Sequence, residues 1–162
     1  MSIAKPWQLT GGEVFVISGS RSIRSYWLFS REMRKLLKDR SPSDTILLQG
    51  EAKFGIDRLA RIFAKRNGWK CVGWPANWDT QGRCAGMVRN ASMLLHADHL
   101  IAAWDGVSNG TKNAINVAET RNIPTNVITM EASPEADDRN IQSIVKYRRL
   151  GDPSRSKIRI KG

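Results

Sequence analysis

The chain has 162 residues, enough for one domain with a buried core, and its 41% hydrophobic and 25% charged residues are typical of a globular protein. No apolar run is long enough to cross a bilayer, and residues 1–12 lack the basic-then-apolar pattern of a signal peptide. Two cysteines, Cys71 and Cys84, make neither a disulfide framework nor a zinc site. We therefore expect a cytoplasmic protein with no membrane contact, no metal and no cofactor.

The positive charge is concentrated at the C-terminal end. The net charge is +11, and residues 139–162 contain eight basic side chains and one acidic one, so they supply +7 of it. A basic end of this kind is typical of contact with nucleic acid or an acidic partner. A solvated tail that keeps the protein soluble explains the same charge equally well, and both readings stay open.

Strand and helix patterns alternate along most of the chain. Short β-branched or apolar runs predict strands, and apolar residues at helical spacing predict helices. The expected strands cover residues 13–18, 45–49, 69–74, 98–104 and 124–130, and the expected helices cover residues 25–39, 57–67, 85–97 and 112–121. Cys71 falls in a strand and is expected in the core.

The pattern weakens after residue 131. Residues 141–147 fit either an edge strand or a short helix, and residues 148–162 fit an extended or flexible tail. We therefore divide the chain into an N-terminal lead (1–12), a domain of alternating strands and helices (13–130) and a C-terminal extension with a basic tail (131–162).

Alternating strands and helices predict a parallel sheet, because right-handed crossovers place helices on both faces. The expected fold is α/β: a Rossmann-like, doubly wound, mostly parallel sheet in a three-layer α/β/α arrangement, with a short basic C-terminal extension. Ligands of such sheets bind at the carboxyl ends of the strands, where the winding reverses.

Four loops that follow expected strands carry the candidate ligand-binding residues. Each combines glycine, which lets the backbone approach a ligand, with groups that bind phosphate, ribose or base. In chain order the candidates are Gly19, Ser20 and Arg21, then Gly50, Gly55 and Asp57, then Trp78, Arg89 and Asn90, and finally Asp105, Gly106, Ser108, Gly110 and Thr111.

Several of these residues have a structural alternative. Arg21 could be solvated, Asp57 could cap its helix, and Asp105 could only start its turn. Trp78 could pack its loop instead of offering a surface to a base. We name no catalytic residue, because the sequence shows no nucleophile set, metal-ligand cluster or P-loop lysine.

Segments 16–21 (VISGSR), 55–60 (GIDRLA), 75–78 (PANW), 85–90 (AGMVRN) and 103–111 (AWDGVSNGT) carry a family resemblance, in order and spacing. Together they resemble the YspA-like branch of the SLOG superfamily, which takes its name from the Smf/DprA and Lonely Guy proteins. The resemblance implies a Rossmann-like domain that binds nucleotides or molecules derived from them. It also implies a dimer or larger assembly.

The resemblance leaves the activity open. Some members hydrolyse the N-glycosidic bond of nucleoside monophosphates, others sense signals related to NAD or ADP-ribose, and DprA-like members bind single-stranded DNA. The hydrolases carry a Gly-Gly-x-Gly-Thr-x-x-Glu motif, and this chain has Ala114 where the glutamate would stand. Glycosidic cleavage needs a carboxylate, which Asp57 or Asp105 could supply instead.

We therefore expect binding rather than efficient turnover. The expected ligand is a phosphorylated nucleotide derivative, ADP-ribose-like, NAD-derived or a cyclic-nucleotide signal, which the protein senses or sequesters. A nucleotide N-glycosidase or phosphoribohydrolase is the first alternative, and DprA-like binding of single-stranded nucleic acid is the second. The basic tail supports the last, although Tyr147 is the sole aromatic residue among its charges.

Overall fold

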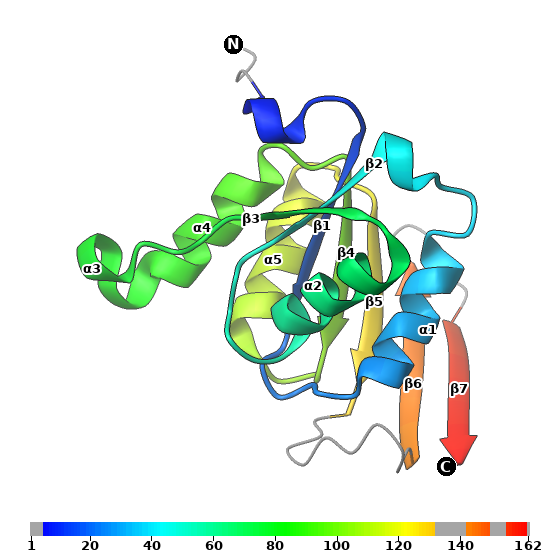
Figure 1. Ribbon diagram of the computed structural model, residues 1–162. Coiled ribbons are helices and arrows are strands. Elements are labelled where there is room, and N and C mark those ends of the chain that lie inside the picture. The colour runs from blue at the N-terminus through cyan, green and yellow to red at the C-terminus, as the bar shows by residue number, and fades with distance from the viewer. Residues whose placement is uncertain (1–4, 132–141, 150–154, 162) are drawn as a thin grey trace.

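The computed structural model describes residues 5–131, 142–149 and 155–161, and they form one sheet with helices on both faces (Figure 1). The seven strands lie in the order β3-β2-β1-β4-β5-β6-β7. The strands are β1 (Glu13–Gly19), β2 (Thr45–Gln49), β3 (Lys70–Gly73), β4 (His99–Trp104), β5 (Thr125–Met130), β6 (Gln142–Arg149) and β7 (Arg155–Lys161). The longer helices are α1 (Tyr26–Leu36), α2 (Ile56–Asn67), α4 (Ala85–Leu94) and α5 (Asn109–Thr120).

The first five strands are parallel, as the alternating pattern predicts, so the Rossmann-like α/β fold is confirmed. The winding reverses between β1 and β4, because the chain runs outward through β2 and β3 and then returns to the other side of β1. Helices on both faces bury the central strands, and all five residues of β2 are buried. This reversal places the carboxyl ends of β1 and β4 side by side.

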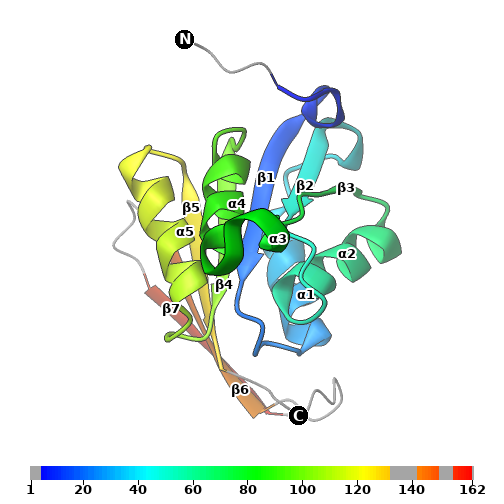
Figure 2. The same cartoon turned by 90° about the vertical axis from the view of Figure 1, so that its left-hand side faces the viewer.

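Two apolar cores separate the helices into layers. One core lies between the sheet and the pair α1 and α2, with Phe29 and Phe63 packed edge to face at its centre. The other lies between the sheet and α4 and α5, and contains Met93 and Ile115. Figure 2 shows α4 and α5 together on one side of the strands and α1 and α2 on the other.

Local signals explain where the helices begin and end. The Ser25 hydroxyl accepts a hydrogen bond from the Leu28 N–H at 3.4 Å and caps α1. Gly68, at φ 74°, ends α2 in the left-handed conformation. Cys71 is half-buried against the first core, as expected, and burial raises its pKa.

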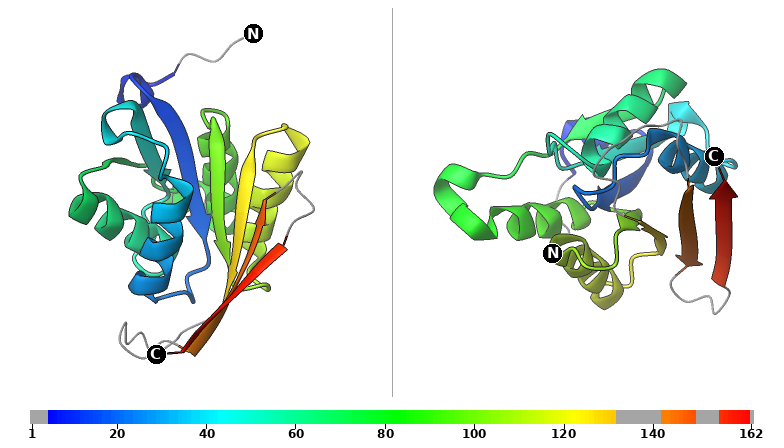
Figure 3. Two further views of the ribbon diagram at one scale, coloured as in Figure 1. Left: turned by 90° about the vertical axis from the view of Figure 1, so that its right-hand side faces the viewer. Right: turned by 90° about the horizontal axis from the view of Figure 1, so that it is seen from below.

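The structure differs from the sequence prediction in three places. Helix α5 begins at Asn109, so Gly110 and Thr111 lie in its first turn rather than in the preceding loop. A short helix, α3 (Trp78–Gln81), and 3-10 turns are present where loops were expected. The C-terminal residues form β6 and β7, an antiparallel hairpin paired to β5 at the outer edge of the sheet (Figure 3). β6 agrees with the edge strand that residues 141–147 allowed, whereas β7 stands where a tail was expected.

Residues 132–141 and 150–154 of the C-terminal extension lie outside the described residues. In the part of the chain that the structure describes, every helix is too short or too polar to span a bilayer.

Candidate functional site

A pocket of about 530 Å³ opens where the winding of the sheet reverses. It is built from the loop after β1, the start of α2, the α3–α4 segment and the first turn of α5, so all four expected loops contribute or lie beside it. The lining residues are Ser18, Gly19, Ser20, Arg21, Ser22, Ala52, Asp57, Trp78, Arg83, Gly86, Met87, Arg89, Asn90, Ser108, Gly110 and Thr111.

The loop after β1 is fixed to the loop after β4. The Ser20 N–H donates to the Ala103 carbonyl at 3.0 Å, and the Ser20 hydroxyl accepts from the Asp105 N–H at 3.0 Å. Gly55, at the start of α2, approaches the backbone of Ser20 and Arg21 so closely that a Cβ there would overlap Arg21. These contacts hold the floor of the pocket in one arrangement.

Asp105 organises the loop after β4. Its carboxylate accepts hydrogen bonds from the Val107 and Ser108 N–H groups at 3.0 and 2.8 Å and from the Ser22 and Ser108 hydroxyls at 2.7 and 2.8 Å. Burial alone would raise its pKa, but these four bonds together lower the pKa of Asp105 well below the ordinary value. The carboxylate therefore acts within the turn and does not line the pocket.

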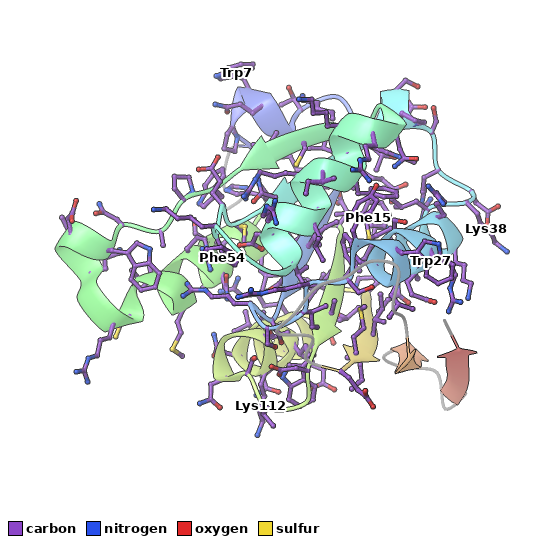
Figure 4. The ribbon with its side chains drawn as sticks, turned by 60° about the horizontal axis from the view of Figure 1, so that its bottom comes forward. Trp7, Phe15, Trp27, Lys38, Phe54 and Lys112 are labelled. Carbon is purple, nitrogen blue, oxygen red and sulfur yellow. The ribbon has the colours of Figure 1, made fainter. Side chains whose placement is uncertain are left out.

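The first turn of α5 faces the pocket with Ser108, Gly110 and Thr111. The first N–H groups of a helix have no partner within the helix, and the helix dipole favours an anion there. Lys112 follows on the exposed side of α5 and does not line the pocket (Figure 4). The Gly-Thr turn thus offers polar donors to a ligand, as expected for phosphate.

Arg89 and Asn90 project from α4 toward the pocket. The Arg89 guanidinium donates to the Gly50 carbonyl at 2.7 Å and to the Asn90 side-chain oxygen at 3.1 Å. Asn90 is buried and its amide nitrogen lies 3.5 Å from the Gly110 carbonyl, which links α4 to α5. A Cβ at Gly50 would lie 2.6 Å from the Arg89 guanidinium, so a larger residue at position 50 would displace this side chain.

Among the described residues that line this pocket, Asp57 alone is acidic. Its carboxylate accepts a hydrogen bond from the Ala52 N–H at 3.1 Å, and the residue as a whole is 7% exposed. Burial raises the pKa of Asp57, and the hydrogen bond from Ala52 and the charges of Arg89 and Arg61 lower it only in part. Burial likewise lowers the pKa of Arg89, while Asp57 opposes that shift.

The charge of the lining is positive, because Arg21, Arg83 and Arg89 face a single carboxylate. Trp78 is 50% exposed and its ring lies 5.7 Å from the guanidinium carbon of Arg21. An exposed flat ring beside guanidinium groups suits a ligand with an anionic part and an aromatic part.

The structure brings most of the predicted site residues around this one pocket, including Arg21, Arg89 and Thr111. Gly50 lines an adjoining pocket, and Gly55, Asp105 and Gly106 line neither. Arg83 also lines the pocket but was not among the predicted site residues. It lies in the 3-10 turn Gly82–Cys84, which has no sequence periodicity and does not directly follow a strand.

Ala114, at the position of the hydrolase glutamate, is buried in the core between the sheet and α5. His99 lies at the opposite end of β4 and bonds Glu13 at 2.6 Å, so it is remote from the pocket. Among the described residues, no group of three His, Cys, Asp or Glu side chains is placed to hold a metal ion.

Comparison with known proteins gives one family match. Residues 14–80 match the model of the family described as YspA, cpYpsA-related SLOG family, which confirms the resemblance found in the sequence. This segment includes the loops after β1 and β2, Asp57 and Trp78. A search of curated proteins gives no match.

Solved structures give weak similarities. The formyltetrahydrofolate deformylase of Burkholderia mallei is 12% identical with a TM-score of 0.41, over 95% of this chain and 56% of that one. The corresponding protein of Pseudomonas syringae is 11% identical with a TM-score of 0.42, over 94% of this chain and 53% of that one. The chain thus spans little more than half the length of these structures.

Proposed function

We propose that this chain, whose residues 14–80 match a SLOG family, binds a phosphorylated small molecule derived from a nucleotide. The observation that carries the proposal is that Arg21, Arg83 and Arg89 line the same pocket as the start of α5. Guanidinium groups and helix N–H groups are the donors that proteins use for phosphate. In this proposal the Trp78 ring stacks on the base, and the carboxylate of Asp57 accepts hydrogen bonds from the ribose hydroxyls.

The finer identity that we propose is an ADP-ribose-like, NAD-derived or cyclic-nucleotide signal, which the protein senses or sequesters in the cytoplasm. Binding without efficient turnover is favoured because Ala114 stands where the hydrolases carry glutamate. We propose a dimer or tetramer on the resemblance alone, and light scattering after gel filtration measures it.

Asp57 supports hydrolysis as a second candidate. It is buried in the pocket, and its pKa is raised by burial, as in carboxyl groups that act as general acids. Glycosidase chemistry on a nucleoside monophosphate would use it to protonate the leaving base or to activate water.

One experiment separates the two. The purified protein is incubated with nucleoside monophosphates and ADP-ribose, the complex is denatured, and the small molecules are analysed by chromatography. Recovery of intact ligand that binds by calorimetry supports sensing or sequestration. Release of free base that stops in Asp57→Asn supports the hydrolase, and the absence of binding to every probe overturns the proposed function.

Nucleic-acid binding is a third candidate, favoured by the register of the C-terminal hairpin. In this pairing, position 146 lies opposite position 157, and position 148 lies opposite position 155. Positions 159 and 161 of β7 share the face of 155 and 157, because alternate residues of a strand lie on one face. All six positions are Lys or Arg. Alternation along a strand thus gathers the basic positions on one face, which fits a phosphodiester backbone.

A further inference from the structure

We infer that the ligand has two ring groups joined through phosphate, and that its second ring occupies a compartment beyond the pocket described above. This inference rests on the proposed function and names the class of ligand more closely. It starts from a second hollow of about 470 Å³, which shares Arg21, Ala52, Trp78 and Arg89 with the first.

The shared residues form the boundary between the two compartments. Arg21 lies over the Trp78 ring at 5.7 Å, and Arg89 is held to the Gly50 carbonyl at 2.7 Å. The two guanidinium groups are close enough that the charge of Arg21 lowers the pKa of Arg89. Two cations that repel each other at a boundary favour an anion between them, so the boundary suits a bridging phosphate.

The walls of the second compartment suit a flat ring. Phe54 is 56% exposed and Trp78 is 50% exposed, and both line this compartment. Pro75 and Ala76 add apolar surface from the segment after β3. Exposed aromatic side chains at a concave site offer stacking to a base.

Hydrogen bonds from α2 and from the end of β2 hold the loop that carries Phe54 in place. The Arg61 guanidinium donates to the Ala52 carbonyl at 2.9 Å and to the Gln49 side-chain oxygen at 3.1 Å. The Ala52 N–H donates to Asp57, and the Glu51 N–H donates to the same Gln49 oxygen at 2.6 Å. A loop fixed in this way loses little entropy when a ligand binds.

Each compartment by itself lies within the range of about 300–1,000 Å³ usual for small-molecule sites. A nucleoside monophosphate needs only one of them. A molecule with a nucleoside on each side of a pyrophosphate would fill both, with its phosphates at Arg21 and Arg89.

The test compares two probes by calorimetry: AMP, with one ring, and P1,P2-di(adenosine) diphosphate, with two. We expect the second probe to bind about tenfold or more tightly than AMP, the scale of one stacked base. Phe54→Ala is expected to remove most of that difference and to leave AMP binding unchanged. The guanine counterparts of both probes allow for base preference.

Trp27→Ala is the matched control. Trp27 is 44% exposed on α1 and lies against Arg31 at 5.3 Å, as Phe54 lies against Arg24 at the same distance. Figure 4 shows Trp27 and Phe54 well apart. This variant should bind both probes as the unchanged protein does.

Two outcomes overturn the inference, and they are distinguishable. If AMP binds but the two-ring probe binds no tighter, or Phe54→Ala weakens neither probe, the second compartment is not a ring site and the proposed function stands. If no probe of either kind binds, the proposed function fails and the inference fails with it.

Discussion

The Arg89 side chain both links neighbouring elements of the fold and lines the candidate site. Its guanidinium bonds Gly50 and Asn90 on one side and lines both compartments on the other. We expect Arg89→Ala to weaken AMP binding by about 1.5–3 kcal/mol, the scale of a hydrogen bond to a charged group. Isothermal calorimetry measures it.

Arg58→Ala is the control for this change, because Arg58 is exposed on α2 and lines neither compartment. Arg89→Lys keeps the positive charge but loses the planar fork, so its affinity should fall between those of the other two proteins. Equal affinity in Arg89→Ala and Arg58→Ala would remove Arg89 from the site.

Asp57 and Asp105 have opposite effects on stability as the pH changes. The pKa of Asp57 in the folded protein is raised above the ordinary 3.8, so folding binds its proton and stability from this group falls as pH rises through that raised pKa. We therefore expect the unfolding free energy of Asp57→Asn to rise relative to that of the unchanged protein as the pH rises above 3.8. Urea unfolding at each pH measures the free energy.

Asp105 is the converse case. Its pKa is lowered from 3.8, so its stabilising effect is present at neutral pH and is lost as pH falls below that ordinary value. The deficit in the unfolding free energy of Asp105→Asn should therefore shrink on acidification. A deficit that stays constant with pH would show that the four bonds to this carboxylate do not depend on its charge.

At the scale of elements, the junction of the β1 loop with α2 depends on Gly55. Its φ of 78° and ψ of −149° lie in a region that glycine alone adopts readily, and a Cβ would overlap the Arg21 backbone. Gly68 has a similar φ of 74° but open space around it. We expect Gly55→Ala to lower the unfolding free energy by about 3 kcal/mol and Gly68→Ala by about 1 kcal/mol.

Urea unfolding of both variants measures this difference. Gly68 ends the same helix in the left-handed region, so it gives the cost of a positive φ without the overlap and without the ψ of Gly55. Equal losses would mean that neither that ψ nor the approach of Gly55 to Arg21 contributes.

The elements and their order could be predicted because each strand and helix carries its own periodicity. Which loops meet also followed, since parallel strands bring their carboxyl ends to one edge. Side-chain direction could not be predicted: Asp105 turns back into its loop, while Asp57 faces the pocket. Helix α3 was missed because four residues carry no period, and strand β7 was missed because its basic residues obscure the apolar alternation.

At the scale of the whole molecule, the hairpin adds a basic face beside the parallel sheet. Replacing Lys157, Arg159 and Lys161 by Gln in one triple variant should weaken binding to single-stranded DNA. Each lost phosphate contact lowers the slope of log K against log salt by about 0.7, so three should lower it by about 2. AMP binding should not change. Filter binding at several salt concentrations measures the slope.

The control substitutes Arg58, Lys65 and Lys70, which are exposed and lie on α2 and β3, at the edge of the sheet opposite to β7. It removes the same charge, so equal slopes in the two triple variants would mean that net charge alone governs the contact.

The outermost strands of the described sheet carry residues that oppose edge-to-edge pairing between copies of this protein. A sheet that ends in an unpaired strand can recruit the same strand of another molecule, and natural proteins oppose this with short strands and with lysine or arginine. Here one boundary, β3, has four residues and starts at Lys70, and the other, β7, alternates basic residues along its length. Like charges on facing strands repel, so the sequence that closes the sheet also disfavours its growth into fibres.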